Sequence, residues 1–150
     1  MNITPSIIEI TDEWYNKQLM DANPNCLFVF GDNMMRVGNG GQAVIRPYPN
    51  TFGVATKAAP SMDENAFFSD EKQRHFDTIK DDLGMLKEIM SSGVYQKIVF
   101  PRNGLGTGLS KLREKAPRIN ALMLEILERD FKIVEVVDLT NGEFRLERKS

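Results

Sequence analysis

The chain has 150 residues, of which 41% are hydrophobic and 27% are charged, a composition typical of a globular domain and not of a disordered or fibrous chain. We therefore predict one domain over residues 1–150. With 19 basic and 21 acidic residues the net charge is -2, so we expect no broad positive surface that would hold a nucleic acid.

The N-terminal sequence and the cysteine content indicate the cellular compartment of the protein. Residues 1–10 lack the basic start and apolar stretch of a signal peptide, and the single cysteine, Cys26, cannot form an internal disulfide. The longest apolar tract, residues 26–30, is much shorter than the roughly 20 residues that cross a bilayer. We expect a cytoplasmic protein with no membrane partner.

The first half of the chain is predicted to contain three strands and one short helix. Residues 6–10 form a short strand, and Thr11 caps a helix that carries Trp14, Leu19 and Met20. The continuous apolar run of residues 26–30 predicts a central strand with both faces covered. Residues 51–56 form a further strand, and residues 57–68 form a loop that could cover a site.

The second half continues the alternation of helices and strands. Apolar residues at helical spacing predict a long amphipathic helix over residues 70–92, which Gly93 ends. Residues 97–101 form a second buried strand, and the helix after it either restarts or kinks at Pro117. Residues 132–139 form a strand, and Asn141-Gly142 turns it into a hairpin. This order predicts an α/β fold with three α/β/α layers, a mostly parallel central sheet and a C-terminal edge hairpin.

Glycine-rich loops follow both buried strands. The first reads GDNMMRVGNGGQAVIR, with a helix start at Gln42 and Ala43, and the second reads RNGLGTGLSK. Ligands of parallel sheets lie beyond the carboxyl ends of the strands, and glycine lets the backbone N–H groups approach a phosphate closely. We predict a phosphate site for a nucleotide-like ligand. The alternative is that the glycines only make turns.

Two familiar phosphate motifs are absent. GLGTGLSK lacks the spacing and the GK[ST] ending of a P-loop, and its alternating glycines do not fit G-x-G-x-x-G. A P-loop NTPase and a Rossmann dehydrogenase are therefore disfavoured.

The strand ending in Asn33, the GNGGQA tract and FPRNGLGTGL followed by a helix resemble the macrodomain family over roughly residues 26–137. That family binds ADP-ribose. The chain is similar in particular to uncharacterised phage-type proteins that carry VFGDN, GGQA and GLGTGL blocks. The resemblance implies that the two loops flank the diphosphate and that Asn33 lies near the distal ribose.

The predicted site residues come mostly from the two loops. Asp32 is a candidate to orient water, with a turn or cap role as its alternative, and Asn33 is a candidate for catalysis or binding. Arg46 and Lys111 also lie near the loops, where such charges either neutralise phosphate or are solvated. The predicted ligand-binding residues are Gly31, Arg36, Gly38, Gly40, Gly41, Gln42, Lys57, Arg102, Asn103, Gly104, Leu105, Gly106, Thr107 and Gly108.

Other side chains are given structural roles. No Cys/His cluster or calcium-loop spacing occurs, so neither a metal nor a cofactor is predicted. Cys26 is expected to be structural, His75 to lie at the surface, and Met34 and Met35 to fill core space or line an adenine pocket. Asp12 is a poorly spaced match for the aspartate that macrodomains use at the adenine amino group.

Three functions remain open at this point. The first is binding of ADP-ribose or a related NAD-derived nucleotide, with hydrolysis of ADP-ribose 1''-phosphate or of an ADP-ribosyl ester. The second is a non-catalytic protein that senses or sequesters such a nucleotide, for example in phage–host conflict. The third is an interaction domain whose glycine loops are only structural. The sequence makes no prediction of oligomeric state.

Overall fold

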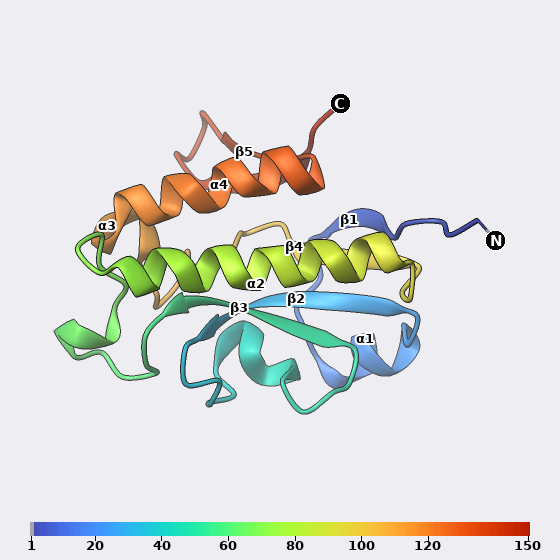
Figure 1. Cartoon of the computed structure of the whole chain (residues 1–150), viewed down its shortest axis with the longest axis horizontal. Coiled ribbons are helices and arrows are strands. Elements are labelled where there is room, and N and C mark those ends of the chain that lie inside the picture. The colour runs from blue at the N-terminus through green and yellow to red at the C-terminus, as the bar shows by residue number, and fades with distance from the viewer. Residues whose placement is uncertain (1) are drawn as a thin grey trace.

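A computed structural model describes residues 2–150, and its centre is a sheet of four parallel strands (Figure 1). The strands are β1 (Ile7–Thr11), β2 (Cys26–Asn33), β3 (Thr51–Lys57) and β4 (Lys97–Pro101), in the spatial order β1-β4-β2-β3. All three pairings are parallel, and β2 pairs with β4 through the register Phe28↔Val99. The predicted parallel sheet and the central position of β2 are confirmed.

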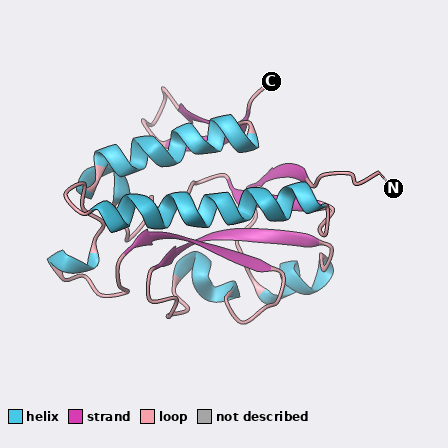
Figure 2. Cartoon of the chain, in the orientation of Figure 1, coloured by secondary structure: helices cyan, strands magenta, loops and turns pink. Residues whose placement is uncertain are grey.

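Helices lie on both sides of this sheet (Figures 1 and 2). On one side are α2 (Gln73–Ser92), the short α3 (Leu112–Lys115) and α4 (Pro117–Phe131). On the other are α1 (Lys17–Ala22) and the 3-10 helix η1 (Gly41–Ile45). A second 3-10 helix, η2 (Glu64–Ala66), lies in the loop after β3. Within residues 2–150, no helix is long and apolar enough to cross a membrane.

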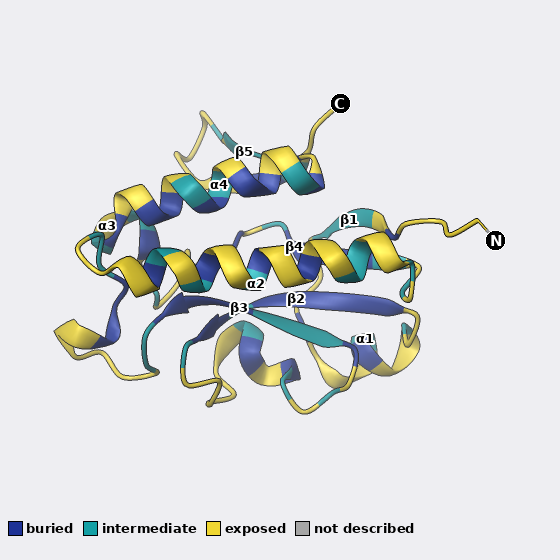
Figure 3. Ribbon diagram, in the orientation of Figure 1, coloured by how far each residue is buried: buried dark blue, intermediate teal, exposed yellow. Residues whose placement is uncertain are grey.

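The two faces of β2 explain its unbroken apolar run. Leu27 and Val29 belong to the larger hydrophobic cluster with α2 and α4, whereas Phe28 and Phe30 belong to the smaller cluster with Met20 and Ile45. Successive side chains of a strand point to opposite faces, so each residue of this run is buried under a helix. The buried stripes of α2 and α4 face the sheet, and their outer sides are exposed (Figure 3).

The C-terminal hairpin differs from the predicted edge hairpin. Strands β5 (Ile133–Val137) and β6 (Phe144–Arg148) pair antiparallel, as predicted, but form a separate two-stranded sheet. Strand β6 lies near the edge strand β1 but forms no ladder with it, so the hairpin does not extend the four-stranded sheet. Leu146 N–H donates to O of Arg102, the residue after β4, at 2.7 Å.

The predicted helix start at Thr11 is wrong. The Thr11 hydroxyl accepts a hydrogen bond from Glu13 N–H in a local turn, whereas the cap of α1 is Asn16, whose Oδ1 accepts from Leu19 N–H at 2.8 Å. Trp14 consequently lies outside the helix and is 83% exposed. The restart at Pro117 is confirmed, because Pro117 occupies the first turn of α4, where no N–H is needed.

The predicted surface position of His75 is also wrong. His75 lies in the first turn of α2, stacks on Phe68 with ring centroids 4.6 Å apart, and is only 1% exposed. Its Nδ1 accepts from Ser69 N–H at 3.0 Å, and among residues 2–150 no group bonds to its Nε2. It precedes Ile79 by one helical turn, so it shares the buried stripe despite its polar neighbours in sequence.

Burial of His75 predicts a pH-dependent stability. Burial, and then the nearby charges of Lys72 and Arg74, lower the pKa of His75. The unfolded chain binds this proton near pH 6.5, so the free energy of unfolding is largest above about pH 7. It falls by at most about 1.4 kcal/mol per pH unit below that, until the lower folded-state pKa is reached.

Urea unfolding between about pH 5 and pH 7.5 measures this effect. Because His75 is the only histidine, the variant His75→Phe should lose the slope near pH 6. An identical slope in both proteins would contradict the assignment.

Candidate functional site

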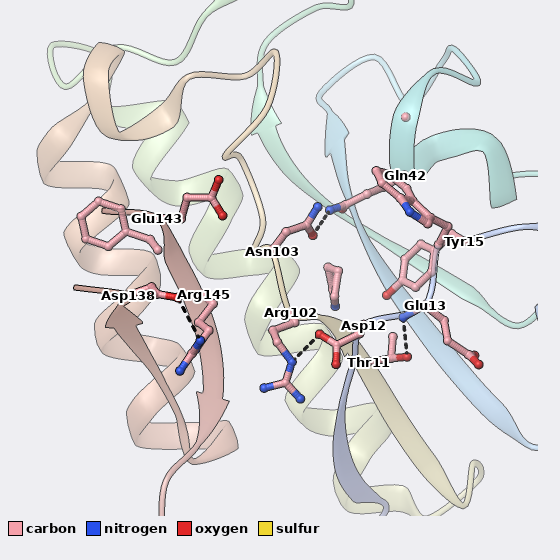
Figure 4. A pocket seen from close by; sticks show the side chains of 14 residues that line it. Thr11, Asp12, Glu13, Tyr15, Gln42, Arg102, Asn103, Asp138, Glu143 and Arg145 are labelled. Atoms are coloured by element: carbon pink, nitrogen blue, oxygen red, sulfur yellow. Dashed lines mark hydrogen bonds and ion pairs between the residues drawn. The ribbon is translucent and has the colours of Figure 1, made fainter. Parts of the chain in front are cut away.

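The two glycine-rich loops lie together at one edge of the sheet because β2 and β4 are neighbours and run parallel. Gln42, from η1, joins them. Its Oε1 accepts from Gly31 N–H at 2.8 Å, and its Nε2 donates to Gly104 O at 3.0 Å and to Asn103 Oδ1 at 3.3 Å (Figure 4). One side chain thus fixes the distance between both loops.

A cleft of about 730 Å³ opens between the loops, which is within the usual range for small-ligand sites. Its walls also include the end of β3 and the start of α3. Among the sequence-predicted residues, those that line it are Gly31, Asp32, Asn33, Gly38, Gly40, Gly41, Gln42, Lys57, Asn103, Gly106, Thr107 and Gly108.

The other predicted residues lie elsewhere. Arg36 is bound by Asp82 of α2, with both oxygens within 2.8 Å of its Nη2. Arg102 pairs with Asp12 and Glu147 in the neighbouring pocket. Leu105 is buried in the hydrophobic core, and Gly104 meets the site through its carbonyl bond to Gln42.

The second loop offers free backbone donors. Gly104 and Gly106 have positive φ values of 93° and 74°, which bend the chain tightly after β4. The N–H groups of residues 106–110 donate to no acceptor within residues 2–150. Unpaired N–H groups in a glycine-rich curve are a recurrent anion-binding arrangement.

The first loop is held by side chains. The Asn33 Nδ2 donates to Val37 O at 2.8 Å, and its Oδ1 accepts from Met35 N–H at 3.0 Å, so its amide closes a turn. The predicted helix start at Gln42 is a single 3-10 turn, and no long helix dipole points at the cleft from this side. Charge on this wall comes instead from Arg46, whose Nε donates to Gly38 O at 2.7 Å.

Asp32 forms an ion pair with Arg46. Its side chain is 2% exposed, and its two oxygens lie 2.6 and 3.0 Å from the two terminal guanidinium nitrogens of Arg46. The Asn33 N–H also donates to Oδ1. Gly53 of β3 leaves room for the Asp32 carboxylate, since a Cβ at this position would clash with Asp32 Oδ2. Asp32 therefore orients Arg46 beside the cleft, and both its oxygens are occupied.

Asn120 is a site residue that sequence reasoning missed. It lies on α4, lines the cleft, and is buried. The signal was present in the sequence, because Asn120 stands three residues before Met123 and seven before Leu127 on the buried stripe of the helix. A polar side chain on such a stripe needs a partner, which the loop sequences alone do not reveal.

A second pocket of about 320 Å³ adjoins the cleft (Figure 4). The residues that they share are Trp14, Gly41, Gln42, Asn103, Glu143 and Phe144. Trp14 and Phe144 expose aromatic surface there, whereas Arg102 and Asp12 form an ion pair of 2.7 Å. The site is thus a polar cleft continued by a pocket with aromatic walls.

The remaining predicted side chains have structural surroundings. Cys26 is buried in the smaller core cluster, and burial raises the pKa of its thiol. Met34 packs against the larger cluster, and Met35 is exposed outside the cleft.

The fold and cleft define an α/β protein with two glycine-rich loops at the carboxyl edge of a parallel sheet. Residues 10–126 match a family of unknown function (DUF7831), and the chain belongs to that family. No curated protein and no solved structure matches the chain.

The Asp32–Arg46 pair predicts a large stability effect. Replacing Arg46 by methionine leaves the buried Asp32 carboxylate with Arg36, 3.6 Å away, as its remaining ion-pair partner, so the free energy of unfolding should fall by about 3 kcal/mol. Urea unfolding measures this loss. The control Lys80→Met removes the exposed pair with Asp77 and should change stability little. An equal fall in the free energy of unfolding in both variants would contradict a larger contribution of the buried Asp32–Arg46 pair.

Proposed function

We propose that this protein binds ADP-ribose or a related NAD-derived nucleotide in a macrodomain-like manner, with the diphosphate between the two glycine-rich loops. The observation that carries the proposal is the cleft itself, bordered by both loops and braced by Gln42. Its unpaired N–H groups at residues 106–110 supply donors of the kind that bind phosphate oxygens.

The adjoining pocket fits a nucleobase. Bases stack on aromatic side chains, and Trp14 and Phe144 expose aromatic surface where the pocket meets the cleft. Asp12, the sequence candidate for the base amino group, is already paired with Arg102. Glu143 lines both compartments and has no ion-pair partner among residues 2–150, so its carboxylate is the better acceptor.

Binding without hydrolysis is the form of the proposal that the site favours. Hydrolysis through Asp32 requires a carboxylate oxygen that is free to orient water, and both Asp32 oxygens are held by Arg46. A sensing or sequestering role needs only affinity. Chromatography of the protein with ADP-ribose 1''-phosphate separates these functions: we expect no product, and a product would establish a hydrolase.

A charge placed in the second loop tests the binding proposal. Gly108→Glu sets a carboxylate beside the proposed diphosphate position and should weaken ADP-ribose binding by at least about tenfold through repulsion. A Cβ at Gly108 meets no atom within 4 Å, so folding should be retained. Calorimetric titration measures affinity, and fluorescence of Trp14, the only tryptophan, provides a second readout in the site.

The control is Gly84→Glu, which adds the same charge to an open position of α2. Gly106 is a poorer choice, because a Cβ there would lie 3.0 Å from Leu112 Cβ and 3.1 Å from Thr56 Cβ at a positive φ. Unchanged affinity in Gly108→Glu would contradict the proposed position. If the wild-type protein binds none of ADP-ribose, AMP and NAD in the titration, an interaction domain with structural loops is favoured.

A further inference from the structure

Lys57 is a buried cation without a counter-ion. It stands at the end of β3, lines the cleft, and is 5% exposed. Its Nζ donates to Ser61 O at 2.6 Å, contacts Met62 Sδ at 3.5 Å and lies 4.9 Å from the centre of the Phe67 ring. No carboxylate of residues 2–150 forms an ion pair with it, although buried charges are ordinarily paired.

Asn120 presents a polar side chain to the same cleft, where its amide keeps some solvent contact. It is 6% exposed, and its side-chain amide bonds to no other group in the described part of the chain. An amide has two donor hydrogens and an acceptor oxygen, and buried groups of this kind normally have partners. Two polar side chains, both more than nine-tenths buried, therefore line one cleft. Within residues 2–150, Lys57 has no carboxylate partner and the Asn120 amide has no side-chain hydrogen bond.

The surroundings add donors of the same kind. The Ser110 hydroxyl lies 2.9 Å from the Thr56 hydroxyl, next to Lys57 in sequence, and the Ser110 N–H is unpaired. The N-terminus of α4 contributes nothing, because Asp70 accepts from Arg118 N–H and Ile119 N–H, each at 3.0 Å. A positive charge, an amide and a hydroxyl together suit an oxyanion.

We propose that Lys57 and Asn120 form a subsite for an anionic oxygen group, a phosphate or a carboxylate, carried by the ligand beyond the part held between the glycine-rich loops. The identity of the ligand rests on the proposed function, but the subsite itself rests on these two side chains. Burial lowers the pKa of Lys57, and a bound anion would raise it again.

The experiment compares ADP-ribose with ADP-ribose 1''-phosphate, which differ by one terminal phosphate. Wild type should bind the phosphorylated ligand at least about tenfold more tightly. Lys57→Met and the nearly isosteric Asn120→Asp should reduce this preference to about threefold or less, while ADP-ribose affinity changes little. Lys57→Arg should recover part of the preference because it keeps the charge.

The matched control is Lys115→Met. The Lys115 Nζ lies 4.7 Å from the same Phe67 ring, but Glu64 pairs with it and it does not line the cleft. This variant should keep the full preference. Equal binding of both ligands by wild type, or a preference that survives in folded Lys57→Met and Asn120→Asp, would overturn the subsite.

A second probe separates the subsite from the nucleotide proposal. In labelled protein, the side-chain amide signal of Asn120, assigned by its loss in Asn120→Asp, is titrated with inorganic phosphate and separately with acetate. A shift without any nucleotide binding would support the subsite and refute the proposed nucleotide. Phosphate-only or acetate-only shifts identify the anion, and no shift with either would overturn the subsite.

Discussion

The parallel pairing of β2 with β4 is the constraint on which the site depends. Because these two strands are neighbours and run in the same direction, the loops that follow them must leave the sheet at one edge. Gln42 then fixes their separation through bonds to Gly31 and Gly104. The strand β3 and the helix α2 lie between these strands in sequence, so the two loops come together only when β2 and β4 have paired.

Charge is distributed unevenly around the cleft. The guanidinium of Arg46 is neutralised by Asp32, and Arg113 pairs with Glu135 and stacks on Phe144. Lys57 has no such partner within residues 2–150. The first two pairs hold cleft walls in place, whereas the charge of Lys57 is the one proposed to meet a ligand. This division separates residues that build the cleft from those proposed to bind in it.

Local patterns predicted most of the secondary structure. The apolar run at residues 26–30 and the helical stripe ending at Gly93 correspond to β2 and α2, because burial on two faces or one requires those patterns. Predictions failed where local signals competed. Thr11 resembled a cap but ends a strand, and His75 has polar sequence neighbours but shares a stripe with Ile79.

The sequence by itself determined the α/β alternation, the two glycine-rich loops and about half of the residues that line the cleft, since these follow from periodicity and backbone freedom. Only the tertiary structure decided which charges are available. Asp32 and Lys57 both follow or end strands, yet Asp32 meets Arg46 and Lys57 meets no carboxylate. Asn120 joins them from a distant helix. Such pairing depends on through-space distances between elements remote in sequence, which a linear pattern does not contain.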